Sequence, residues 1–73
     1  MDIKEFANYC RENIGDFDKR LDLAWDRVSK MRCPFVMADM GLTQEVFECL
    51  DDYCAENGLE VDDYDIEDLM GEI

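Results

Sequence analysis

The sequence predicts a single all-α domain, a compact bundle of about four short helices spanning residues 1–73. Apolar residues recur every three or four positions along most of the chain, which is typical of helices with one buried face. No stretch alternates apolar and polar residues for long enough to predict a strand. The length allows one domain, and an apolar fraction of 48% distinguishes the chain from a disordered acidic tail.

The first helix is expected over about residues 2–14, where an apolar stripe begins at Ile3. Asp2 with Glu5 three residues later resembles a capping box, in which a side chain at each position bonds to the backbone of the other. Gly15 follows the stripe and is expected to end the helix, because glycine readily adopts the left-handed conformation found there.

The second helix is expected to begin at a cap formed by Asp16 or Asp18. It should end near Met31 or Arg32, because Pro34 disfavours helical geometry at the residue before it. The following residues, 33–42, are apolar enough to be buried, and their pattern fits either a short helix or an irregular turn.

A third helix is expected to be capped by Thr43 and to end at Asn57 and Gly58. Its inward residues are predicted to be Val46, Phe47, Leu50, Tyr53 and Cys54. A last short helix, capped by Asp62 or Asp65, should follow. Its apolar face is predicted to contain Ile66, Leu69, Met70 and Ile73.

Charge is distributed very unevenly along the chain. All seven Lys and Arg residues lie in residues 1–37, together with seven Asp and Glu, so that this half is neutral. Residues 38–73 contain thirteen acids and no base, and they account for the whole net charge of −13. An asymmetry of this kind indicates an interaction surface of one sign, because solubility alone is usually achieved with interspersed charges. Direct nucleic-acid binding is disfavoured, since it needs clustered Lys and Arg.

Two groups of carboxylates are the predicted partner-binding residues. The first, which we call the helix stripe, consists of Glu45, Glu48, Asp52 and Glu56. Their spacing of i, i+3, i+7 and i+11 places them on one outward face of the third helix, about 4.5–6 Å apart along the axis for most neighbours. The second, the C-terminal patch, consists of Asp62, Asp63, Asp65 and Asp68.

Other classes of function find little support in the sequence. The four cysteines lack the spacing of a zinc site, and disulfides are not expected in the cytoplasmic location that we predict from the absence of an apolar leader. Asp63, Asp65 and Glu67 imitate the start of a calcium loop, but Asp68 stands where that loop requires glycine. With no His and a single Ser, the chain is expected not to be an enzyme and to need no metal or cofactor.

Two segments resemble known families. Asp39-Met40-Gly41-Leu42, followed by an acidic helix, resembles the region of acyl carrier proteins that holds the prosthetic group. That family attaches the group at a serine in Asp-Ser-Leu, which this segment lacks, so the resemblance implies no carrier function. Val36 to Leu50 resembles a helix-turn-helix with its turn at Gly41-Leu42-Thr43, but an acidic second helix would repel phosphate.

The leading hypothesis is an acidic decoy that binds a basic nucleic-acid-binding protein and blocks its phosphate site. In size and charge the chain resembles DNA mimics from phages and mobile elements, which act as anti-restriction or anti-CRISPR inhibitors. The alternative is a small adaptor or self-associating module, in which a basic strip of Arg20, Arg27 and Lys30 meets the acidic helix of another copy as a homodimer. A third hypothesis is an antitoxin or anti-activator, which exposure of Trp25, Phe35 or Tyr64 would favour.

Overall fold

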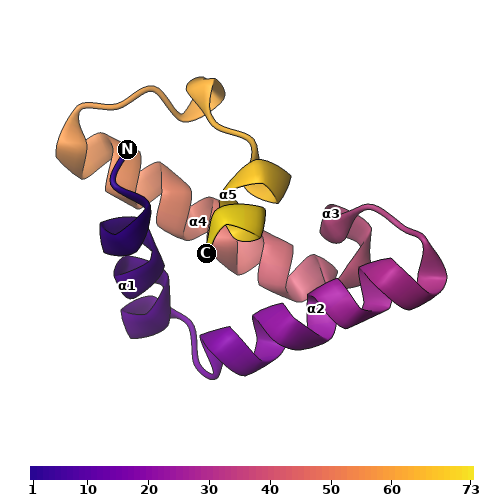
Figure 1. Ribbon diagram of the computed structural model, residues 1–73. Helices are drawn as coiled ribbons and strands as arrows, with labels where there is room; N and C mark the ends of the chain where they lie inside the picture. Colours follow the sequence, from indigo (N-terminus) through magenta and orange to yellow (C-terminus); the bar gives the residue numbers. More distant parts are fainter.

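The computed structural model describes residues 1–73 and confirms the predicted all-α fold (Figure 1). It contains four helices of two or more turns and one very short helix, with no strand. The elements are α1 (Ile3–Asn13), α2 (Phe17–Met31), α3 (Phe35–Ala38), α4 (Met40–Asn57), the 3₁₀ turn η1 (Val61–Asp63) and α5 (Ile66–Glu72). No helix combines the length and the apolar character that crossing a membrane requires.

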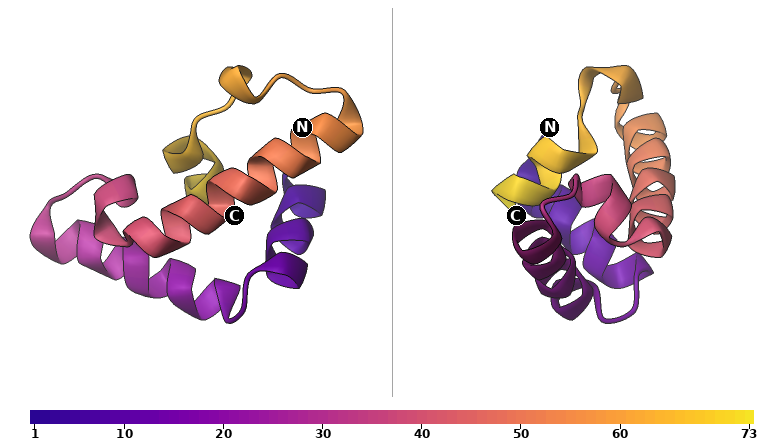
Figure 2. Two further views of the ribbon diagram at one scale, coloured as in Figure 1. Left: turned by 180° about the vertical axis from the view of Figure 1, so that it is seen from behind. Right: turned by 90° about the vertical axis from the view of Figure 1, so that its right-hand side faces the viewer.

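The helix α4 is the central element of the bundle. It packs against α1, α3 and α5, while α2 is held mainly through α3 and α1. Figure 2 shows α4 along one edge of the molecule, where no other helix covers its outer side. One long side of α4 therefore remains available to solvent.

The core is one continuous cluster of sixteen buried residues to which every helix contributes. Phe6 of α1, Phe35 of α3 and Leu42 of α4 are almost fully buried, and Trp25 stacks at a tilt on Phe35 with ring centroids 4.8 Å apart. The indole Nε1 of Trp25 donates a hydrogen bond of 3.3 Å to the carbonyl oxygen of Met70, which ties α2 to α5.

Both ends of α1 lie within one residue of the predicted range of about 2–14. The Asp2 carboxylate accepts hydrogen bonds from the backbone N–H groups of Lys4 and Glu5, at 3.0 and 3.3 Å. The helix ends in an extended residue, Ile14, and Gly15 does not adopt a left-handed conformation. The helix thus ends just before Gly15 as predicted, but the left-handed conformation expected at Gly15 is adopted by Asp16 instead, with φ of 53°.

The same conformation explains why Asp16 does not cap α2 with its side chain. The residue occupies the N-cap position, yet its carboxylate accepts no hydrogen bond from the first turn. An N-cap carboxylate reaches those N–H groups from extended geometry, which a φ of 53° does not provide. The predicted end near Met31 or Arg32 is confirmed, with Arg32 also left-handed at φ of 51°.

The segment 33–42 contains α3, and α4 begins four residues earlier than predicted. The N-cap is Asp39, whose carboxylate accepts a 3.0 Å hydrogen bond from the N–H of Leu42. Thr43 as the cap was therefore wrong. Thr43 is a buried residue within the first turns of α4, and its hydroxyl lies within donating distance of the carbonyl oxygens of Val36 and Asp39.

The early start of α4 also removes the turn expected of a helix-turn-helix. Gly41-Leu42-Thr43 lies within the first turns of α4, and the preceding α3 has only four residues.

A second error concerns Phe47, which was predicted to face inward but is exposed. The predicted end at Gly58 is confirmed, since this residue is left-handed with φ of 67°.

The last helix agrees with one of its two predicted caps. The Asp65 carboxylate accepts a 2.8 Å hydrogen bond from the N–H of Glu67, whereas Asp62 lies in η1. Ile66, Leu69 and Met70 are buried as predicted.

Candidate partner-binding surface

The helix stripe lies on α4, and three of its four carboxylates form no ion pair with a cation of the chain. Glu48, Asp52 and Glu56 are exposed and form no ion pair within the chain. Glu45 differs, because it is partly covered and forms an ion pair with Arg20 of α2. At this one position packing therefore brings a cation from the other half of the chain, since residues 38–73 contain no base.

A groove between α1 and α4 adds carboxylates that the sequence did not assign to this surface. It has a volume of about 300 Å³, and we call it the α1/α4 groove. It is lined by Glu5, Asn8, Tyr9, Glu12, Tyr53, Glu56 and Asn57. The spacing of i, i+7 between Glu5 and Glu12 shows that they share one side of α1, but only the fold brings them beside Glu56.

Two tyrosines form the aromatic wall of the α1/α4 groove. The Tyr53 hydroxyl donates a hydrogen bond of 3.3 Å to a Glu5 carboxylate oxygen. The Tyr9 and Tyr53 rings pack edge to face, with their centroids 5.9 Å apart. Partial burial raises the pKa of Tyr9, and the negative charges of Glu56 and Asp52 raise it further. Burial and the negative charge of Glu5 likewise raise the pKa of Tyr53. Both hydroxyls are consequently neutral hydrogen-bonding groups near pH 7, beside carboxylates that attract cations.

A smaller hollow of about 180 Å³ lies beside the rest of the helix stripe. Its lining residues are Asn13, Ile14, Glu45, Glu48, Cys49 and Asp52. The acids of the stripe thus follow the junction of α1 and α4 rather than an isolated helix.

Two buried cysteines near this junction, Cys10 and Cys49, have raised pKa values. Burial raises the pKa of Cys10 to about 12, and the neighbouring Cys49 acts in the same direction. Burial also raises the pKa of Cys49. Because the thiolate is the nucleophilic and metal-binding form, neither thiol is activated for chemistry near pH 7. All four cysteines are unpaired, and no three side chains of the metal-ligating types are grouped to hold an ion.

The C-terminal patch lies apart from the helix stripe. Asp63, Asp65 and Asp68 line a hollow of about 270 Å³ between the N-terminal residues and α5, whereas Asp62 is exposed in η1 and does not line this hollow. Lys4 and Arg11 line the neighbouring groove between α1 and α5. The structure therefore brings together the helix stripe with Glu5 and Glu12, but it does not merge that surface with the C-terminal patch.

The predicted basic strip is largely engaged within the chain. Arg20 pairs with Glu45, Lys30 pairs with Asp26 at 3.0 Å, and Arg27 donates to the carbonyl oxygen of Ala38.

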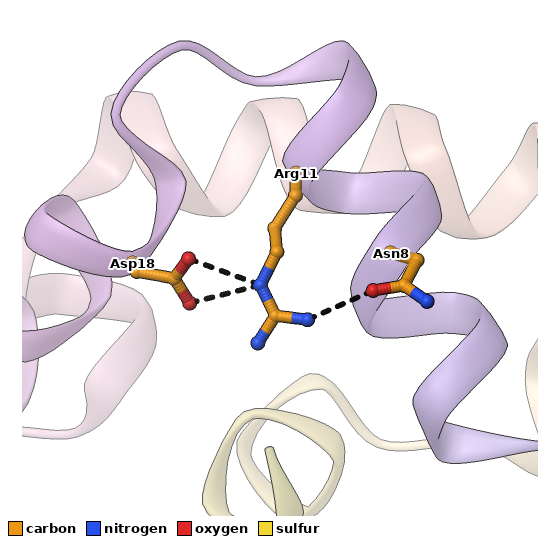
Figure 3. A network of polar contacts seen from close by, with 3 residues as sticks. All are labelled: Asn8, Arg11 and Asp18. Carbon is orange, nitrogen blue, oxygen red and sulfur yellow. Dashed lines mark hydrogen bonds and ion pairs between the residues drawn. The ribbon is translucent and has the colours of Figure 1, made fainter.

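Another cation, Arg11, joins α1 to α2. Its Nε lies 3.1 and 3.0 Å from the two Asp18 carboxylate oxygens, and its Nη1 donates to the side-chain oxygen of Asn8 (Figure 3). Such internal contacts leave few cations to neutralise the acids of α4.

Comparison with known proteins adds no relative to this description. No protein-family model, curated protein or solved structure matches the chain.

Proposed function

We propose that the protein binds a basic nucleic-acid-binding protein and blocks its phosphate-binding site. In this proposal it acts as a decoy of the anti-restriction or anti-CRISPR type, encoded by a phage or mobile element and working in the cytoplasm. The supporting observation is that Glu48, Asp52 and Glu56 lie on the solvent-exposed side of α4 and form no ion pair with a cation of the chain.

The physical argument concerns the spacing and the reach of these charges. Neighbouring carboxylates of the helix stripe are about 4.5–6 Å apart along the axis, compared with one phosphate per roughly 3.4 Å of a nucleic-acid strand. Lys and Arg side chains that hold phosphates can therefore pair with the carboxylates. A field of one sign also accelerates association with a basic partner, and this acceleration falls as salt rises.

The alternative, a self-associating adaptor, has less support from the contacts. It requires a free basic strip, whereas Arg20, Arg27 and Lys30 are all engaged within the chain. The third hypothesis, an antitoxin or anti-activator, would be favoured by exposure of Trp25, Phe35 or Tyr64. Phe35 is buried, and Trp25 and Tyr64 are partly covered.

A capture experiment with charge-reversed variants tests the proposal. Immobilised wild-type protein should retain nucleic-acid-binding proteins from a bacterial lysate and release them when duplex DNA is added. Glu48→Lys with Asp52→Lys should abolish this retention. The control variant, Asp22→Lys with Glu60→Lys, makes the same charge change at exposed residues outside the surface and should retain binding.

The decoy mechanism makes a further demand on any captured protein. Added wild-type protein should displace it from labelled DNA in a gel-shift assay, and the Glu48→Lys, Asp52→Lys variant should not. Retention that DNA fails to reverse, or equal displacement by both variants, would contradict the proposal. Circular dichroism of each variant verifies that the helical fold is intact.

A further inference from the structure

Exposed apolar side chains lie on α4 beside the helix stripe. Met40 is 69% exposed and Phe47 is 45% exposed, although both belong to a helix whose other large apolar residues are buried. Met37 of α3, three residues before Met40, is 61% exposed. We call Met37, Met40 and Phe47 the apolar strip. It ends on the same long helix whose outer side no other helix covers (Figure 2).

The apolar strip and the helix stripe lie on different flanks of that outer side. Seven helical steps place Met40 and Phe47 within about 20° of each other around the axis. Glu48 follows Phe47 by one step, or about 100°, and leads to the remaining acids of the stripe. Asp51, about 40° from Phe47, lies between the two flanks. The outer side of α4 is therefore apolar along one flank and negative along the other.

Charge argues against a second copy of the chain as the occupant of this side. Each copy carries a net charge of −13, and two α4 helices in contact would bring their unpaired acids together. Like charges at an interface oppose association, and three of the four basic residues of α2, namely Arg20, Arg27 and Lys30, are engaged internally. The complementary occupant carries positive charge next to apolar side chains.

We propose that the outer side of α4 binds a cationic amphipathic helix of a partner protein. Apolar side chains of that helix pack on Met40 and Phe47, and its Lys or Arg residues face Glu48 and Asp52. Methionine suits such a surface, because its flexible side chain adapts to different apolar shapes. The inference rests on the proposed function in one respect, in that it specifies which element of the basic partner is bound.

Two labelled model peptides test the inference without an identified partner. One is an amphipathic helical peptide of Lys and Leu, and the other has the same Lys residues with Gln in place of Leu. Fluorescence anisotropy at moderate salt should show at least tenfold tighter binding of the Lys/Leu peptide by the wild-type protein. Phe47→Ser should remove most of this preference. The control Leu23→Ser alters an apolar residue of similar exposure on α2 and should preserve it.

The result that overturns the inference is equal affinity for the two peptides, or an equal loss in the Phe47→Ser and Leu23→Ser variants. Sedimentation at high salt tests the other occupant. A dimer that Phe47→Ser dissociates would assign the apolar strip to self-association and also overturn the inference. The proposed function fails separately, when charge reversal at Glu48 and Asp52 leaves DNA displacement intact. Circular dichroism and thermal unfolding of both Ser variants exclude a folding defect as the cause.

Discussion

Arg20 of α2 forms an ion pair with Glu45 of α4, and this is the single ion pair that involves the helix stripe. The contact spans 25 residues of sequence and joins the neutral half of the chain to the acidic half. It divides the stripe by role. Glu45 holds two helices together, while Glu48, Asp52 and Glu56 form no ion pair within the chain and are the residues that we propose bind a partner.

Substitution at Glu45 should therefore affect folding more than binding. Arg20→Ala and Glu45→Ala should each lower the free energy of unfolding. Because both side chains are partly exposed, we expect a coupling energy of only about 0.5–1 kcal/mol between them. A double-mutant cycle measured by urea unfolding determines this value. Glu48→Ala is the matched control and should show no coupling with Arg20→Ala.

Substitutions at the N-cap residues of α1 and α2 should change the stability of the fold in opposite directions. Asp2→Ala removes two hydrogen bonds to the start of α1 and should cost about 1 kcal/mol. Asp16→Gly should instead stabilise by up to about 1 kcal/mol, because glycine adopts a φ of 53° without strain and no cap bond is lost. Thermal unfolding followed by circular dichroism measures both. A loss of stability in Asp16→Gly would show that the Asp16 side chain has a role beyond the turn.

Alkaline pH should destabilise the fold through Cys10. Its pKa is about 12 in the folded protein and about 9.0 as the reference value, so the folded state holds its proton to higher pH. The stabilising effect is complete below pH 9 and is lost progressively as pH rises toward 12, by at most about 1.4 kcal/mol per pH unit. Urea unfolding between pH 8 and 11 should show that the free energy of unfolding falls more steeply with pH for the wild type than for Cys10→Ala. Parallel slopes would contradict this assignment.

Loss of the hydrogen bond from Trp25 to Met70 should loosen the packing of α5 against α2. Trp25→Phe keeps an aromatic ring against Phe35 but removes the indole N–H, and it should cost about 1 kcal/mol plus the effect of the smaller ring. Hydrogen exchange of the α5 amides should accelerate more than exchange in α1. Uniform acceleration along the chain would instead indicate a general loss of stability.

The helical fold was predictable because burial imposes a period of about 3.6 residues on the apolar positions. Local capping rules were less reliable where several polar residues competed. Thr43 satisfies the pattern of an N-cap, but Asp39 takes that position because the chain already turns into helix there. The inward prediction for Phe47 failed because periodicity marks a helix flank without showing whether another helix reaches it.

The acidic site was predictable only as a property of one helix. Regular spacing placed Glu48, Asp52 and Glu56 together, and the structure retains them on one surface. Glu5 and Glu12 were missed because they belong to the neutral half of the chain and join the site only through packing of α1 on α4. The pairing of Glu45 with Arg20 likewise depends on a long-range contact that spacing along the chain cannot show.

Unpaired carboxylates on the solvent-exposed side of α4 also make the free protein less stable than its core would allow. Folding holds Glu48, Asp52 and Glu56 at fixed short separations, and each like-charge pair costs a few tenths of a kcal/mol. Added salt screens this repulsion, so the melting temperature should rise between low and moderate ionic strength. A cationic partner would relieve the same repulsion and stabilise the fold through binding. A shift in melting temperature could therefore identify the partner before any activity is known.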